Sequence, residues 1–292
     1  MIHKLEDFKV YKRFSEFKHR SSWVNNFYTD SSQLPKELFD GVEGVDDIDT
    51  HKANPWIFEA LDKGKEFYFG HLKENFPLFY NSLINNCSEL VIVEEKMIDH
   101  TLGGKERGGF SYLYYFSVVS KSNQMLNFSF PGTNANMKVR SDFLQEKLGD
   151  KLPLIFLELY KTFNYFSKFD TADEPFSPVL IEMVGSFRKM ENIIDTETVL
   201  PYTESYLKNR VSNEMSVIMR TGCFDHILID TENNDQKLYL SIGPGFDNLK
   251  ELKNPAEHLD AYFSQVLMGT CPRKPNPYND DGDTYYSLDV EF

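Results

Sequence analysis

The chain has 292 residues, of which 41% are hydrophobic and 15% aromatic, so it can bury a core in one large domain or two smaller ones. This composition argues against disorder over most of the length. The net charge is −14 at a sequence pI near 5.0, which disfavours partners such as nucleic acid or an anionic membrane and favours a basic partner.

The first half of the chain predicts helices followed by strands. A short capped helix should end at Gly41, and a longer helical stretch should run from Pro55 to residue 86 with a break at Pro77, because proline interrupts the helical hydrogen-bond ladder. Alternating β-branched and aromatic runs then predict strands over 90–98, 110–120 and 124–130. Only the tripeptide KSN separates the last two, which indicates a hairpin.

The second half begins with helical periodicity and continues with strands. One short helix is expected at 141–150, and a second from Pro153, with an apolar face formed by Phe156, Leu159, Tyr160, Phe163 and Phe166. Strands are expected at 178–184, 214–220, 224–230 and 236–242, the last two joined by the turn TENND. His226, within the third of these, is expected to face solvent.

The last helix is the clearest element. Asn254 is a suitable N-cap, Pro255 occupies the first helical position, and Glu257 completes a pattern like a capping box. Gly269 should end the helix. The Pro- and Asp-rich remainder to Phe292 is expected to be an extended acidic tail.

Residues 138–268 follow the order helix, Leu-Pro, helix, strands, helix, and they carry short motifs in that order. The motifs are Leu152-Pro153, the run LYKTFN at 159–164, Gly222 with Asp225 and Asp230, and AEHLDAYFSQVL at 256–267. In this respect the chain resembles the SUKH superfamily of bacterial immunity proteins and fungal cell-wall regulators. It departs from the pattern where Tyr165 and Phe224 replace glycines.

The resemblance implies an α+β fold with helices packed on a twisted, mostly antiparallel sheet, and no catalysis. It divides the chain into an N-terminal α+β region (1–137), a SUKH-like domain (138–270) and an acidic C-terminal tail (271–292). Many members of the superfamily bind and neutralise a toxin, often a nuclease. Nucleases bind phosphate and are usually basic, which suits an acidic inhibitor.

Acidic residues gather in three stretches of the sequence. Residues 40–50 and 278–292 each contain five acidic residues and no basic one, and the third stretch follows Gly222. Runs of charge are commonly only solvated surface, and Asp225 and Asp230 could equally cap turns and strand ends. The candidate partner-binding residues are Asp173, Glu174, Asp225, Asp230, Glu232 and Asp235.

Motifs for common catalytic sites are missing from the sequence. The seven histidines never fall at the i, i+4 spacing of a zinc-binding helix, and the three cysteines form no CxxC pair. The glycine-rich stretch at 103–109 lacks the GK[ST] ending of a P-loop, and no GxSxG is present. Adjacent acidic pairs such as Glu94-Glu95 should point to opposite faces of a strand, but any two of the 45 acidic residues could still lie near one another in the fold. We therefore expect no catalytic residue, no metal and no cofactor.

The sequence also indicates the cellular compartment of the protein. Charges occupy the N-terminus where a signal peptide would be apolar, no run of 18 apolar residues occurs, and three scattered cysteines suit a reducing compartment. A cytoplasmic protein is expected. The leading hypothesis is an immunity protein that binds a basic toxin, the alternatives being a regulatory or scaffold protein and an enzyme with an unfamiliar carboxylate site.

Overall fold

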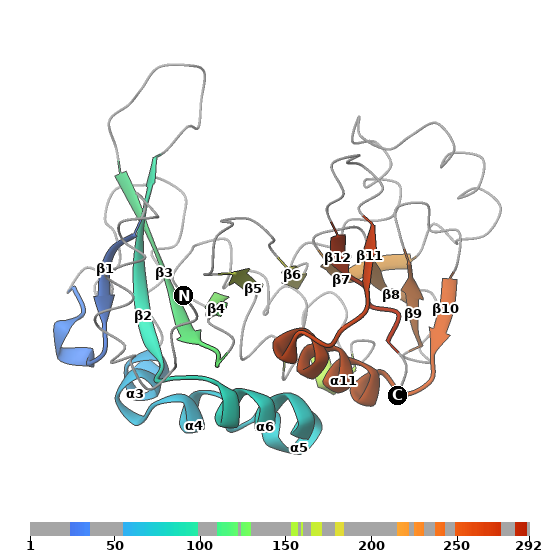
Figure 1. Ribbon diagram of the computed structural model, residues 1–292, viewed down its shortest axis with the longest axis horizontal. Coiled ribbons are helices and arrows are strands. Elements are labelled where there is room, and N and C mark those ends of the chain that lie inside the picture. Colours follow the sequence, from blue (N-terminus) through green and yellow to red (C-terminus); the bar gives the residue numbers. More distant parts are fainter. Residues whose placement is uncertain are drawn as a thin grey trace.

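The computed structural model describes residues 24–35, 55–98, 110–121, 124–129, 153–156, 159, 165–170, 179–183, 215–221, 225–230, 237–242, 249–275 and 284–290. Within them the fold is α+β, with helices packed against one antiparallel sheet of ten strands (Figure 1). The strands of the sheet lie in the order in which they occur in the sequence, so each hydrogen-bonds to the next along the chain.

The first strand and a chain of short helices precede the rest of the sheet. Strand β1 (Val24–Tyr28) is followed by the 3-10 turn η2 (Ser31–Gln33), and four helices then follow in close succession. These are α3 (Pro55–Lys63), α4 (Lys65–Tyr68), α5 (Leu72–Asn75) and α6 (Pro77–Asn86). The expected break at Pro77 is confirmed, because Pro77 opens a new helix.

Nine further strands complete the large sheet, and one long helix packs with the shorter helices. The strands of the large sheet are β2 (Val91–Ile98), β3 (Phe110–Val119), β4 (Gln124–Ser129), β5 (Tyr165–Asp170), β6 (Val179–Met183), β7 (Met215–Thr221), β8 (His226–Asp230), β9 (Leu238–Ser241) and β10 (Leu249–Leu252). Helix α11 (Pro255–Met268) follows, and β11 (Arg273–Pro275) pairs with β12 (Thr284–Tyr286) in a small second sheet. Both predicted hairpins are confirmed, since β3 pairs with β4 and β8 with β9.

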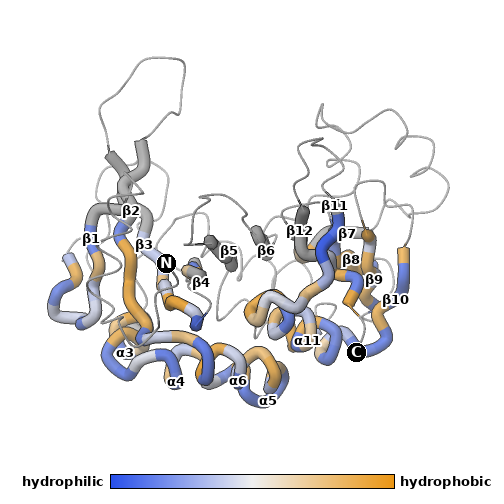
Figure 2. The backbone as a smooth tube through the Cα atoms, viewed as in Figure 1, coloured by the Kyte–Doolittle hydropathy of each residue, from blue (hydrophilic) through white to orange (hydrophobic). Residues whose placement is uncertain are grey.

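One hydrophobic core lies between the sheet and the helices. The strand register aligns Ile92, Phe116 and Phe128 across β2, β3 and β4, and all three are fully buried. From the helical side, the Tyr68 ring lies 4.3 Å from that of Phe116, and Phe69 packs edge-on against Phe128. Figure 2 shows hydrophobic residues gathered along β2, β8 and β9.

The same core and the same sheet run across the expected domain boundaries. Strand β4 lies before residue 137 and pairs with β5, which lies after it. Leu288 and Val290, in the expected acidic tail, are buried in the same hydrophobic cluster as Tyr28. Neither boundary therefore separates two cores among the described residues.

Two local expectations are wrong, and a third is confirmed only in part. Phe166 lies in β5 rather than on a helix, because pairing of β5 with both β4 and β6 outweighs the local helical periodicity. His226 is 5% exposed, because every residue of β8 is buried. Asn254 is the N-cap of α11 and Pro255 opens the helix, as expected, but the Asn254 side chain donates to the Glu257 carboxylate and accepts no hydrogen bond from the helix backbone.

Candidate functional site

Two of the six candidate partner-binding residues lie in the described part of the chain. These are Asp225, which directly precedes β8, and Asp230, its last residue. The other four, Asp173, Glu174, Glu232 and Asp235, lie outside the described residues, as do the resemblance motifs around 160–164 and Gly222.

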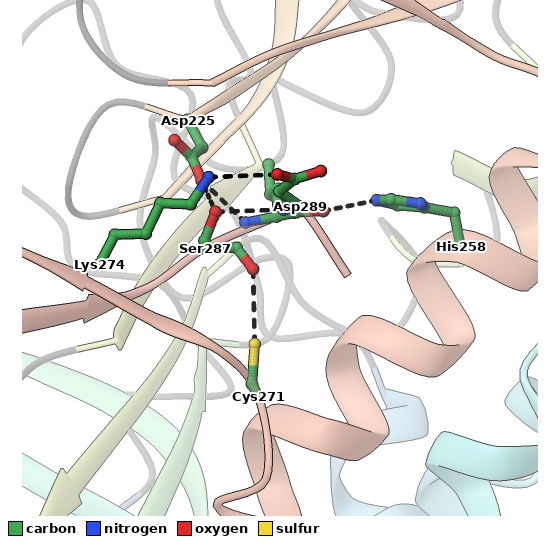
Figure 3. A network of polar contacts seen from close by, with 7 residues as sticks. Asp225, His258, Cys271, Lys274, Ser287 and Asp289 are labelled. Atoms are coloured by element: carbon green, nitrogen blue, oxygen red, sulfur yellow. Dashed lines mark hydrogen bonds and ion pairs between the residues drawn. The ribbon is translucent and has the colours of Figure 1, made fainter. Parts of the chain in front are cut away.

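Asp225 is an interior residue. Its side chain is fully buried, and its Oδ2 accepts hydrogen bonds from the backbone N–H of Leu288 at 2.8 Å and from Ser287 Oγ at 3.1 Å (Figure 3). A partner cannot reach a carboxylate enclosed in this way, so the expectation that Asp225 faces a toxin is corrected. Asp230 is only 9% exposed, which makes it a poor candidate as well.

Asp225 belongs to a polar network that holds the segment after β12 against the fold. From α11, His258 Nε2 lies 2.7 Å from the carbonyl oxygen of Leu288. Cys271 Sγ donates to the carbonyl of Ser287, and Ser287 Oγ accepts the backbone N–H of Asp289. Figure 3 shows these side chains converging on residues 287–289 from the residue before β8, from α11 and from the chain that follows α11.

The environment of His258 favours the neutral imidazole. Burial lowers the pKa of His258 below its usual 6.5, the nearby Lys250 adds to this effect, and the Leu288 carbonyl and Asp289 oppose it. Asp289 in turn forms an exposed ion pair with Lys274 at 3.2 Å. Such a surface pair contributes little to stability, so the buried contacts dominate the network.

The contacts of this network are suited to holding the backbone of residues 287 and 288 in place. In catalytic triads an acid orients a histidine, which activates a nucleophile, and the three side chains touch one another in sequence. Here Asp225, His258 and Cys271 each contact residues 287 or 288, and the contacts are mainly with backbone atoms. Their shared role is to hold the C-terminal segment in place.

A second buried carboxylate, Glu94, lies in β2. It is 4% exposed and accepts hydrogen bonds from the hydroxyls of Tyr28 and Tyr114 and from the amide of Asn26. The register explains the arrangement, because Asn26 and Tyr114 are the residues paired with Glu94 on the two neighbouring strands. Sequence reasoning missed this cluster, since its partners are set by strand pairing across 66 residues.

A third buried carboxylate, Asp260, joins two helices. Its oxygens accept the backbone N–H groups of Leu78 at 3.0 Å and Phe79 at 2.7 Å, in the first turn of α6. Burial raises the pKa of Asp260, and the two backbone hydrogen bonds oppose that rise. The sequence did contain a signal that Asp260 is buried. Asp260 lies three residues before Phe263 and seven before Leu267, so it falls on the apolar face of α11.

The described residues carry only a small part of the net negative charge of the chain. They include 16 acidic and 12 basic side chains, against 45 and 31 in the whole chain. The rest of the sequence therefore contributes 29 acidic and 19 basic side chains, or −10 of the net −14. The described residues therefore carry a net charge of −4, and the acidic stretches 40–50 and 231–235 lie outside them.

The described residues show neither a metal-binding cluster nor a membrane-spanning helix. No three side chains among their His, Cys, Asp and Glu lie together in a way that could hold a metal ion. None of the helices found there combines the length and the apolar character that crossing a membrane requires.

Comparisons of the chain with protein-family models, with curated proteins and with solved structures found no match.

Proposed function

We propose that this chain is a non-catalytic binding protein that captures and neutralises a basic protein toxin through acidic surface segments, as a bacterial immunity protein does. One observation carries the proposal. The chain carries a net charge of −14, with acidic stretches at 40–50, 225–235 and 278–292. A concentrated negative field accelerates encounter with a basic protein and fixes its orientation.

The interior of the framework supports the same proposal. Its buried carboxylates, including Glu94, Asp225 and Asp260, accept hydrogen bonds from other parts of the fold. These groups stabilise the structure and are not available to a partner, so a partner would have to bind other acidic residues. The SUKH-like organisation of residues 138–268 belongs to the same proposal and rests on the motifs quoted above.

The test is co-expression with the product of the neighbouring open reading frame. We expect that product to be toxic alone, to be harmless with this chain, and to co-purify with it in low salt. Raising the salt concentration should weaken the complex, because screening reduces attraction between opposite charges. A product that is not toxic, or that this chain neither binds nor neutralises, contradicts the proposal, and binding without protection favours a scaffold role.

Charge reversal locates the surface. Replacing Asp173, Glu174, Glu232 and Asp235 by Lys should weaken toxin binding at least tenfold and reduce its salt dependence. The matched control reverses four exposed acidic residues of the framework, Glu66, Glu74, Glu89 and Glu251, and changes the net charge by the same amount. Equal losses in both variants would show that total charge, and not these four positions, governs binding.

A further inference from the structure

Ser287 and Leu288 have every backbone polar group bound by groups from other parts of the fold. The partners, which we name the main-chain clamp, are Asp225 Oδ2, His258 Nε2, Cys271 Sγ and the carbonyl oxygen of Pro272. Asp225 accepts from the Leu288 N–H at 2.8 Å, and His258 Nε2 lies 2.7 Å from the Leu288 carbonyl oxygen. Figure 3 shows the three clamp side chains around residues 287–289.

The clamp differs from the pairing of a strand. Within the large sheet, the backbone groups of one strand bind the backbone groups of the next, and about two-thirds of all protein hydrogen bonds are of this backbone–backbone kind. At residues 287 and 288 most of the partners are side chains instead. Peptide-binding sites gain affinity from hydrogen bonds to the main chain, which is the same in every sequence.

The side chains of the held segment define a pattern. Leu288 is fully buried and Val290 is 6% exposed, and both belong to the hydrophobic core. Asp289, between them, is exposed and lies 3.2 Å from the ammonium group of Lys274. Buried positions at alternate residues give a peptide-binding site its specificity. The pattern is a small residue followed by an apolar, an acidic and a second apolar residue.

We propose that the main-chain clamp is a peptide-binding site, that residues 287–290 are its resident ligand, and that a partner protein with a segment of the same pattern replaces them. The clamp bonds are made to backbone atoms, so a partner's segment makes the same bonds. The resident segment follows β12, which pairs with β11 in the two-stranded sheet, so its departure breaks no pairing in the ten-stranded sheet. This site is separate from the acidic residues proposed to bind a toxin.

A labelled peptide with the sequence of residues 284–292, added to the full chain, tests the proposal. In the wild type the resident segment competes at a high effective concentration, so the peptide should bind weakly. Leu288→Asp places a charge at a fully buried position and should drive the resident segment out of the clamp. Fluorescence anisotropy should then show the peptide binding to this variant at least tenfold more tightly than to the wild type.

Further variants show whether the clamp itself binds the peptide. Adding Asp225→Ala to the Leu288→Asp chain removes the acceptor of the amide and should weaken peptide binding at least tenfold. A peptide that carries Leu288→Asp should not bind. The control peptide with Asp289→Asn should bind within about threefold of the wild-type peptide, because the ion pair that it loses is exposed.

Urea denaturation covers the case in which Leu288→Asp unfolds the chain. A ligand that binds only the folded state stabilises it, so the peptide should raise the urea midpoint of the Leu288→Asp chain, or restore its fold, and should leave the wild-type midpoint unchanged. A folded variant that binds the peptide no better than the wild type overturns the proposal. So does an unfolded variant that the peptide does not restore, or binding that Asp225→Ala does not weaken. None of these results bears on the binding of a basic toxin, so the two proposals can fail independently.

Discussion

The carboxylate of Asp260 accepts the backbone N–H of Phe79 at 2.7 Å, although the two residues are 181 positions apart in the sequence. Phe76, the N-cap of α6, has no side-chain group able to bind the free N–H groups of the first turn. Asp260 takes that role from a neighbouring helix, and its negative charge also interacts favourably with the helix dipole. The contact ties α11 to α6.

Removing the Asp260 carboxylate should therefore destabilise the whole fold. Asp260→Ala leaves two backbone N–H groups at the start of α6 without this acceptor, and we expect a loss of about 1–3 kcal/mol in the free energy of unfolding. Urea denaturation measures it. The control Glu251→Ala, at an exposed position, should change stability by less than about 0.5 kcal/mol. Equal effects of the two substitutions would contradict the structural role of Asp260.

The elements that could be predicted from sequence are those fixed by local pattern. Strands β2, β3, β4, β6, β7, β8 and β9 and helix α11 were expected within a few residues of their observed bounds, since alternation and capping are local signals. Strand β10, with the sequence LKEL, was missed because two exposed charged residues hide its alternation. Strand β5 was misassigned because its neighbours in the sheet, which the sequence does not reveal, determine its conformation.

The site was harder to predict than the fold. Asp225 was singled out for its charge, but its burial depends on Ser287 and Leu288, which lie more than 60 residues away. The same holds for Glu94 and Asp260, whose partners come from distant strands and helices. A sequence shows that a carboxylate is present, but only the packing shows whether the fold or the solvent surrounds it.

The Asp225 contacts predict a local effect at the C-terminal segment. Asp225→Ala should leave the Leu288 amide without its acceptor and accelerate hydrogen exchange at residues 287–290 at least tenfold. Amides of α6 should be affected less, since they lie outside this network. Asp225→Asn, which keeps an acceptor oxygen, should show a smaller change. Uniform acceleration over the whole chain by either variant would instead indicate a general loss of stability.

Burial should also protect Cys87 from chemical modification. Burial raises the pKa of the Cys87 thiol to about 12, although Lys65 nearby opposes the rise. Only the thiolate reacts, so iodoacetamide at pH 8 should modify Cys87 in the native protein at least about 100-fold more slowly than in urea. Peptide mass spectrometry gives the rate for this residue separately from the other cysteines. Similar rates in the native and unfolded protein would show that the thiol is accessible.

His258 should make the fold sensitive to mild acid. Because burial lowers its pKa below 6.5, the unfolded chain binds a proton more readily than the folded chain does. The stability associated with neutral His258 is therefore fully present above pH 6.5, and it decreases as the pH falls through the folded-state pKa. Urea denaturation between pH 8 and pH 5 should show a loss in the wild type that is reduced in His258→Gln, whose amide can still donate to the Leu288 carbonyl. The control His71→Gln, at a half-buried position just before α5, should lose stability with falling pH as the wild type does. If His258→Gln and the wild type lose stability equally over this range, the protonation of His258 is not coupled to folding.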